Sequence, residues 1–511
     1  MKGNLMNSPR VVFPLLLVAL SGCAVGPDYH APENQLTHAW RAGQSDQASH
    51  PLMTDTQVSW WENFNDPLLN SLIQRATQGN LSLQQSVLRI AGAREQVSSA
   101  QGGLFPTLNG QAAYSRQQLG LKGELQSQGV YDAIPNNLAN QATGSVNFYQ
   151  GGFDASWELD LWGKTRRQIE LARASEQQQI EQHNDALVSL EAEVTRTYLQ
   201  LRAAQASAAS LTQQIAIAQQ SLELTQSQMQ NGLAPTSDVE SATAQLAALQ
   251  AQLPQYHSQI AQAKNALAVL IGRTPGALDN ELAAAKPLPH LPQLVAVGVP
   301  AQLTRRRPDI RAAEANLHAQ TANIGVSVAQ LFPSLSLTGQ LGVRNTDISY
   351  MDNWSSHFYS IGPGINLPIF EGGRLVANVK LARAQQAAAA LNYRQTVLTA
   401  LQEVENALVS YRTGQQQETS ILQSRDALQR AFALASENYK KGFVTYITVL
   451  DAQRQLAQTD QQAIQAQAQT AVDLVALYKA LGGGWEQQSA ASLPHYSVFG
   501  EVDKTGVTDS Q

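Results

Sequence analysis

One long stretch of the chain carries a helical pattern without interruption. From Lys164 to Asn231, 68 residues contain neither proline nor glycine. Within this stretch, a stripe of mainly apolar positions is spaced by four and three residues in alternation: Leu211, Ile215, Ala218, Leu222, Thr225 and Met229. A 3.5-residue repeat of this kind is typical of helices that supercoil with a left hand. It predicts a single helix of roughly 100 Å, at ~1.5 Å per residue.

Other segments are expected to supply the partners of this helix. The long ones are Thr236–Ile271, Leu375–Tyr439 and Ile447–Leu481, and shorter helices are expected at roughly 66–103 and 307–331. Their seams are rich in alanine, which favours close helix approach in a tube wall over a two-stranded zipper. Pro254 lies inside one segment and should kink it, because proline removes a helix hydrogen bond.

Four segments alternate between apolar and small polar residues with a period of two. They are Pro106–Arg116, Ser145–Leu161, Pro333–Arg344 and Ser356–Phe370. The alternation predicts half-buried strands, and it equally suits barrel strands with one face toward lipid. Trp157, Trp162 and Trp354 lie near strand ends, where an interfacial aromatic belt would be. An ordinary soluble sheet with these aromatic residues in its core is the alternative.

The order of these elements occurs twice along the chain. Leu171–Ala174 recurs as Leu381–Ala384 at an offset of 210 residues, and the same offset relates Gly232–Leu246 to Gly442–Leu456 without a gap. Upstream, the motif Leu-Phe-Pro recurs at an offset of 227 residues. A register sustained over so long a stretch indicates two similar halves.

The duplication and the composition divide the chain into six expected parts. These are a signal peptide at 1–22, a lipid-anchored N-terminal segment at 23–65, a first repeat at 66–273, a Pro-rich connector at 274–300, a second repeat at 301–481 and a C-terminal tail at 482–511. The polar region from Gln117 to Thr143 is expected to be an outward loop between two strands.

The first residues have the composition of an export signal. Basic residues precede an apolar stretch of about ten residues, which is too short to cross a bilayer as a helix. Leu20–Cys23 then resembles a bacterial lipobox, in which cleavage before the cysteine leaves it to carry acyl chains. We expect Cys23 to be lipidated and Ala24 after it to favour the outer membrane. The alternative is a plain signal peptide with an incidental cysteine.

Composition excludes several classes of protein. Hydrophobic residues make up 43% of the chain, too many for charged disorder, and a net charge of -6 argues against nucleic acid as a partner. One cysteine excludes a disulfide scaffold. The histidines show no metal-ligand spacing, and no phosphate-binding loop or nucleophile motif occurs. We therefore expect no enzyme activity, no metal and no cofactor apart from the covalent lipid.

The expected fold is of mixed α and β class and is incomplete in one chain. Four strands cannot close a barrel, because about eight is the small end of known barrels, and open edges invite further pairing. A ring of identical chains that share one barrel solves this problem. Three chains would supply twelve strands around an open lumen, with a helical cylinder below them.

Several motifs together resemble a known family. They are Val25–Tyr29, Trp157–Gly163, Arg307–Arg311, Leu331–Pro333, Leu367–Arg374, Leu450–Arg454 and Leu477–Trp485. The set is similar to that of the TolC-type outer-membrane factors, in the lipoprotein (NodT/OprM-like) branch that serves tripartite efflux systems. The resemblance implies a homotrimer with a twelve-stranded barrel in outer-membrane lipid, continuous with a periplasmic α-helical tunnel. It also implies a periplasmic adaptor (membrane fusion) protein and an inner-membrane pump, often of the resistance-nodulation-division type. The chain would then be a passive, gated conduit for small molecules.

The resemblance also implies which residues close the tunnel. In the family, the last hairpin lines the constriction with an apolar and an acidic residue, which by motif are Ile447 and Asp451, with Arg454 one turn later. Three copies of Asp451 would form a carboxylate ring that attracts cations. Asp238 is a further candidate, but Ser241 stands at the repeat position of Asp451, which argues against a ring of six acids. The turn tips around Gly232 and Gly442 are the expected adaptor contacts.

A simpler explanation of the two acids stays open. Ser237–Glu240 has the spacing of a capping box around Asp238, and Asp451 follows Thr448 by three residues. Both acids could therefore stabilise a helix N-terminus by typically 0.3–1 kcal/mol through the helix dipole.

Two other functions use the same features. A type I secretion outlet for proteins shares the fold, and an ABC exporter encoded beside the gene would distinguish it. The other alternative is a periplasmic coiled-coil lipoprotein without a channel, which would form no heat-modifiable trimer.

Overall fold

The computed structural model describes residues 24–33, 40–41, 59–118, 120–130, 133, 135, 144–289, 291, 295 and 300–486. The expected signal peptide, Cys23 and the tail beyond residue 486 lie outside them. The chain divides into two units, each described by itself. The sheet unit contains the described residues of Met1–His30, Ala93–Glu176 and Asn316–Ala389, and the helical unit contains those of Ala31–Gly92, Gln177–Ala315 and Ala390–Gln511.

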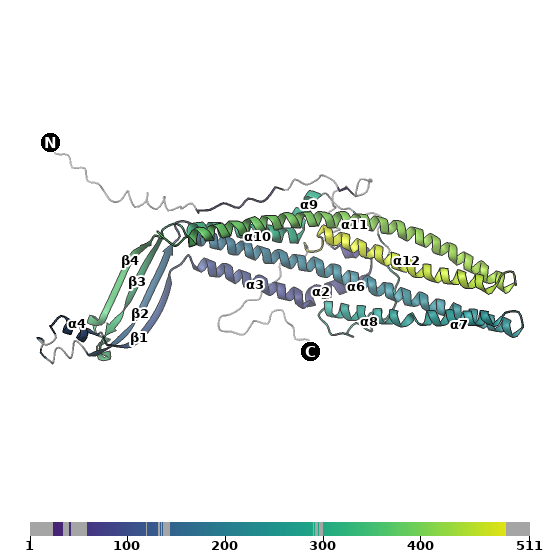
Figure 1. The fold of residues 1–511 in the computed structure, drawn as a ribbon, viewed down its shortest axis with the longest axis horizontal. Helices are drawn as coiled ribbons and strands as arrows, with labels where there is room; N and C mark the ends of the chain where they lie inside the picture. The colour runs from purple at the N-terminus through teal and green to yellow at the C-terminus, as the bar shows by residue number, and fades with distance from the viewer. Residues whose placement is uncertain are drawn as a thin grey trace, which may run out of the picture. The chain divides into compact units, whose positions relative to one another are not determined.

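The sheet unit contains four antiparallel strands in the order β1-β2-β3-β4 (Figure 1). They are β1 (Thr107–Gln118), β2 (Ser145–Leu159), β3 (Ser334–Asn345) and β4 (His357–Asn366). The four predicted strands are thus confirmed, except that the fourth ends early. Leu367–Phe370 was expected to extend it, but these residues follow the strand, because Pro368 has no N–H to donate to the ladder.

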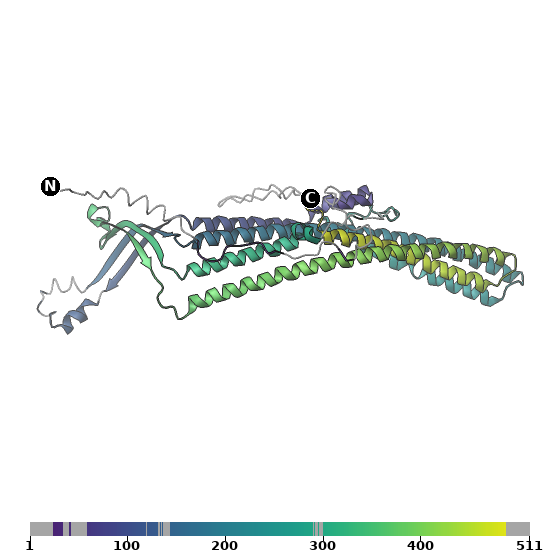
Figure 2. The ribbon, with the colours of Figure 1, turned by 90° about the horizontal axis from the view of Figure 1, so that it is seen from above.

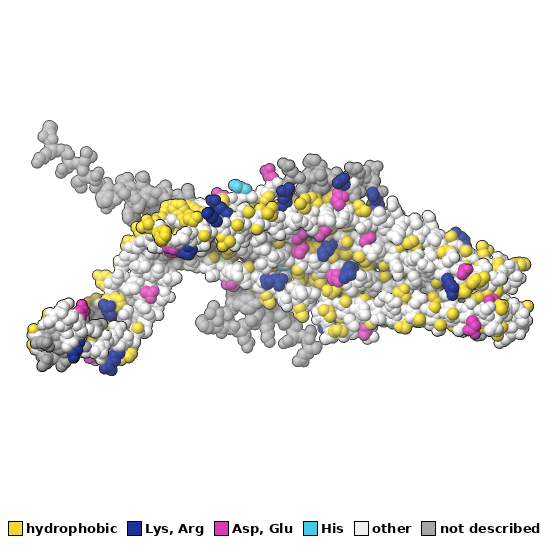
Figure 3. All heavy atoms as spheres, viewed as in Figure 1, with side chains coloured by type: hydrophobic (Ala, Val, Ile, Leu, Met, Phe, Trp, Pro, Cys, Tyr) yellow, Lys and Arg dark blue, Asp and Glu magenta, His cyan; other side chains and the backbone are white. Residues whose placement is uncertain are grey.

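Apolar side chains on this sheet face solvent in the single chain. The exposed ones include Leu108, Phe153, Leu341, Tyr359, Ile361 and Ile365. Hydrophobic side chains also gather where the strands meet the helices (Figure 3), and Ile369 and Phe370 are almost fully exposed there. Trp354 is exposed as well. A soluble sheet with its aromatic residues in a core therefore does not describe this unit.

The duplication appears as elements of equal length. α6 (Lys164–Gln230) and α11 (Arg374–Lys440) both have 67 residues, and their bounds differ by the predicted offset of 210. α3 (Leu81–Gly102) and α10 (Pro308–Ala329) both have 22 residues, and their bounds differ by the predicted offset of 227. The two halves are therefore repeats in structure as well as in sequence.

Proline makes one difference between the repeats. The first hairpin returns in two pieces, α7 (Thr236–Gln250) and α8 (Leu253–Leu270), with Pro254 in the first turn of α8. The second returns in one helix, α12 (Tyr446–Leu481). The predicted kink is confirmed. Short helices η1 (Trp60–Phe64), α2 (Pro67–Gly79) and α9 (Pro300–Arg306) complete the helical unit.

The loop between β1 and β2 is not wholly irregular. It contains the short helix α4 (Leu121–Ser127), which the polar composition did not predict. Among the described residues, none of the helices combines the length and the apolar character that crossing a membrane requires.

The two hairpins end in the same way within the helical unit. Asn80 Nδ2, just before α3, donates to the Leu270 carbonyl at 2.9 Å. Arg307 Nη1, just before α10, donates to the Ala480 carbonyl at 2.9 Å. Each carbonyl lies at the end of its hairpin's returning helix, so the same position in each repeat satisfies an otherwise unpaired helix C-terminus.

Candidate functional site

The two hairpin turns lie at the same end of the helical unit (Figures 1 and 2). In the first, the Leu233 N–H donates to the Gln228 carbonyl and the Gly232 N–H to that of Met229. The second repeats this pattern with every number raised by 210. Gly232 and Gly442 take φ values of 72° and 75°. Both turns are therefore Schellman motifs, which require the left-handed conformation that glycine adopts without strain.

Each glycine is followed by an exposed apolar residue. Leu233 is 78% exposed and Phe443 is 76% exposed. We call these two exposed apolar side chains, which stand at equivalent points of the two turns, the tip surface. The two glycines were predicted as contact points from the sequence, whereas these two side chains were not, although they are equivalent at the offset of 210.

The first turns of α7 and α12 show whether each acid can interact with a helix dipole. α7 begins with Pro235 as N-cap and no side-chain cap, so Ser237 is already helical and the predicted capping box is wrong. Asp238 lies in the first turn of α7, where the helix dipole favours an acid. α12 begins at Tyr446 and has no acid in its first turn. Because the dipole effect fades beyond the first turn, it does not explain Asp451.

A four-helix core lies beneath the turns. It is formed by buried residues of α6, α7, α11 and α12: Leu211, Ala218, Leu222, Ala242, Leu246, Leu249, Tyr439, Tyr446, Val449 and Leu450. The rings of Tyr439 and Tyr446 are 5.7 Å apart. Burial, with smaller contributions from Tyr439 and Asp238, raises the pKa of Tyr446 to about 12. The Tyr439 hydroxyl has no hydrogen-bond partner among the described residues.

The expected gate residues differ in their surroundings. Ile447 and Asp451 are exposed on α12. Arg454 Nε instead donates to Gln245 Oε1 of α7 at 2.8 Å. Gln453 is buried next to it, and neither amide atom of Gln453 has a partner in the described part of the chain. Arg454 therefore joins the two hairpins, while Ile447 and Asp451 are exposed in the single chain.

Other polar contacts join α12 to the first hairpin. Tyr256 Oη of α8 donates to Gln461 Oε1 at 3.0 Å, and Gln461 Nε2 donates to the Ser207 carbonyl of α6 at 3.3 Å. These polar links between the hairpins, including the one through Gln245, were not predicted from the sequence. The sequence does show glutamine at positions of the helix seam that are usually apolar, and this pattern could have indicated them.

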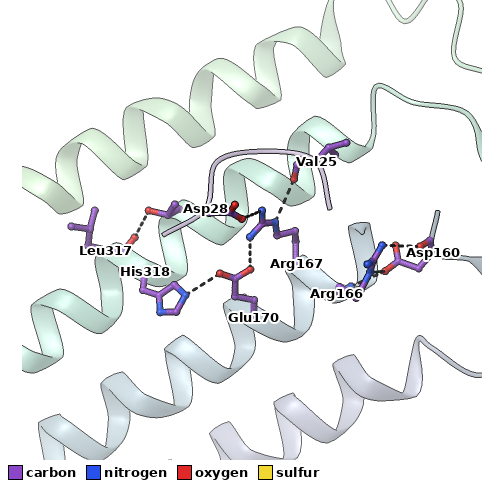
Figure 4. Close-up of polar contacts among 9 residues, drawn as sticks. Val25, Asp28, Asp160, Arg166, Arg167, Glu170, Leu317 and His318 are labelled. Atoms are coloured by element: carbon purple, nitrogen blue, oxygen red, sulfur yellow. Dashed lines mark hydrogen bonds and ion pairs between the residues drawn. The ribbon is translucent and has the colours of Figure 1, made fainter. Parts of the chain in front are cut away.

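The segment that follows Cys23 is bound to the sheet unit (Figure 4). Val25 N–H donates to the Trp162 carbonyl at 3.0 Å, and Arg167 Nε donates to the Val25 carbonyl at 3.4 Å. A Cβ atom on Gly26 would lie 2.5 Å from Gly325 Cα. The backbones of the segment and of α10 thus touch directly, and only glycine fits.

A chain of charges fixes this segment (Figure 4). Arg167 Nη2 binds Asp28 Oδ1 at 2.6 Å, and Nη1 binds Glu170 Oε2 at 2.7 Å. Glu170 Oε1 in turn lies 3.0 Å from His318 Nε2, and the His318 ring stacks on Tyr29 at 4.2 Å. The hydrogen bond from Arg167 and its charge hold the pKa of Asp28 below its usual value. The sequence motif included Val25–Tyr29 but not these helix partners.

Comparison with known proteins decides the family. The model of the family described as outer membrane efflux protein matches residues 72–273 and 299–483, which is one match for each repeat. The chain belongs to the outer membrane efflux protein family. The probable efflux pump outer membrane protein SepC of Pseudomonas putida is 32% identical over 94% of this chain and 97% of its own length. Nodulation protein T of Rhizobium leguminosarum bv. viciae is 30% identical over 95% and 96%.

Solved structures agree with this family. The outer-membrane channel OprN has a TM-score of 0.80 and 32% identity, covering 91% of this chain and 100% of that one. The outer-membrane channel MtrE of Neisseria gonorrhoeae has a TM-score of 0.78 and 28% identity, covering 91% and 99%. The efflux protein therefore has the TolC-like fold and is the outer-membrane channel component of an efflux pump, not an enzyme. The described residues contain no cluster of potential metal ligands.

Proposed function

We propose that this efflux protein works as a homotrimer whose twelve strands close one barrel in outer-membrane lipid. The observation that carries the proposal is the four-stranded sheet, whose edge strands β1 and β4 each pair with a single neighbour among the residues that the structure describes. Unpaired backbone groups cannot be left facing hydrocarbon, because each costs several kcal/mol there. Three copies would satisfy every edge and turn the exposed apolar side chains toward lipid.

Acyl chains on Cys23 would add a second attachment to the membrane. The contacts of residues 24–30 support this proposal, because they would hold the lipidated end on the sheet unit rather than on a loose tether.

The proposed parts of the chain are a signal peptide at 1–22, an anchored segment at 23–65, repeats at 66–273 and 301–481, a connector at 274–300 and a tail at 482–511.

The tunnel would close at the hairpin turns. In the trimer, three copies of Ile447 would form an apolar constriction and three copies of Asp451 a ring of carboxylates that attracts cations. Arg454 would hold α12 against α7 through Gln245 in the closed state. Asp238 would act mainly on the helix start and on the two buried tyrosines.

The partners would be a periplasmic adaptor and an inner-membrane pump of the proton-driven resistance-nodulation-division type, as the resemblance implies. The adaptor would bind the tip surface, with Leu233 beside Gly232 and Phe443 beside Gly442. Relatives named for the efflux of toluene and of antibiotics support small organic molecules as the cargo. Their names favour efflux over protein secretion.

Single-channel conductance of the purified protein in a planar bilayer tests the gate. We expect native mass spectrometry to give a trimer, the wild type to open rarely and to a small conductance, and Asp451→Ala to open wider. Glu437→Ala is the matched control, because it removes an exposed acid of α11 that pairs with Lys441 near the same turn. Equal conductance for all three proteins would remove Asp451 from the gate, and a monomer would overturn the shared barrel.

A further inference from the structure

Glu191 is a buried carboxyl group in the helical unit that the channel function does not use. It lies within α6, its side chain is 0% exposed, and neither carboxyl oxygen has a hydrogen-bond partner among the described residues. A carboxylate without donors in an apolar site is strongly disfavoured, so such a group takes up a proton instead. Burial, and to a smaller extent the charge of Glu486, raises the pKa of Glu191 well above its usual value.

Two distant segments meet over this carboxyl group. Trp60 of η1 is fully buried, its indole N–H also lacks a partner, and its ring stacks on Tyr478 of α12 at 5.2 Å. Gly484 lies beyond the end of α12 with φ 115°. A Cβ atom there would be 2.1 Å from Glu191 Oε2 and 3.4 Å from Trp60 Nε1. The helix η1 and the segment after α12 thus close over the same group.

The charged groups around this site do not compensate a negative charge. Glu486 belongs to the segment after α12 and is itself paired with Arg306 of α9 at 2.8 Å. Arg311 of α10 lies over the Trp485 ring at 4.9 Å and pairs with Glu181. On α12, the Tyr478 hydroxyl accepts a hydrogen bond from Asn63. Both arginines are therefore engaged with other acids.

We propose that Glu191 is a proton-controlled latch, which holds residues 59–65 and 482–486 on α6 while it is neutral and releases them when it ionises. The physical reason is hydration. A charge at this position needs water, and water reaches the carboxyl group only if one of the two covering segments moves away. The latch concerns η1 and the segment after α12, and it does not depend on the proposed gate.

The sign of the pH effect follows from linkage. The folded state retains the Glu191 proton to a higher pH than the unfolded state, whose pKa is near the ordinary 4.5. The stabilising contribution is therefore fully present below that value and is lost as the pH rises toward the folded pKa. Release of one proton changes an opening equilibrium by up to about tenfold per pH unit.

Hydrogen–deuterium exchange of the purified full-length protein between pH 5 and pH 9 tests the latch. After correction for intrinsic exchange rates, we expect protection of residues 59–65 and 482–486 to fall as the pH rises in the wild type. Glu191→Gln keeps the size of the side chain but cannot ionise, so its protection should not depend on pH. Glu193→Gln is the matched control, because Glu193 of the same helix is only half-buried and is paired with Arg196, and this variant should behave as the wild type.

Three results would overturn the proposal. The first is a wild type whose two segments keep constant protection across the range, a result that needs no variant to fold. The second is a Glu191→Gln protein that retains the wild-type pH dependence. The third is a loss of protection in Glu191→Gln at every pH, because the neutral amide should keep the segments closed.

Discussion

Arg307 offers the sharpest test of how the second repeat is held together. Its side chain is 9% exposed. Nε and Nη2 bind the two oxygens of Asp309 at 3.0 and 2.7 Å, and Nη1 binds the Ala480 carbonyl at the end of α12. Arg307→Met keeps much of the side-chain volume but removes every donor. The Ala480 carbonyl and the Asp309 carboxylate then lose their main partner.

The expected cost follows from these contacts. Of these contacts only the bond to the Ala480 carbonyl reaches α12, and a hydrogen bond from a charged group contributes about 1.5–3 kcal/mol. The pairs with Asp309 and Glu403 lie outside α12 and stay intact when its last turn opens. At 1.4 kcal/mol per factor of ten, the last turn of α12 should open about 10- to 140-fold more often in Arg307→Met.

Hydrogen–deuterium exchange of residues 477–482 measures this opening. Arg425→Met is the control, because Arg425 of α11 pairs at the surface with Asp426, and such an exposed pair contributes about 1 kcal/mol or less. Protection in Arg307→Met equal to that in Arg425→Met would refute the argument that Arg307 secures the end of the helix.

Three further predictions concern the helical unit. Tyr439→Phe should stabilise the core beneath the turns by about 1–3 kcal/mol, because it removes a buried hydroxyl without a partner; a raised urea midpoint checks this, and a lowered one contradicts it. Gly442→Ala and Gly232→Ala should each cost about 1–2 kcal/mol, since a side chain is strained at positive φ even in open space; unchanged midpoints would show that the turns adapt. Burial, and the charge of a nearby arginine, lower the pKa of His183, which lies 2.6 Å from Ser86 Oγ. The contribution of neutral His183 to stability is therefore present above pH 6.5 and lost as the pH falls below that value. The melting temperature of His183→Gln should therefore fall less steeply toward acid pH than that of the wild type.

The sequence by itself determined the elements and their repetition. Helix length follows from local periodicity and from the absence of proline and glycine, so the bounds of α6 were predicted to within one residue. The strand pattern is equally local, and it located all four strands. The errors are local too: Pro368 ended β4 early, and the capping box failed because α7 begins one residue before Ser237.

Only the tertiary structure decided which side chains meet. Arg454 contacts Gln245 across 209 residues, and Arg167 contacts Asp28 across 139. The sequence placed each of these residues on a helix or in a motif, but their partners depend on how separate helices pack. Burial has the same origin, because Glu191 resembles the other acids of α6 until η1 and the segment after α12 cover it. Period and propensity act over a few residues, whereas charge pairing and desolvation depend on neighbours that only the folded chain brings together.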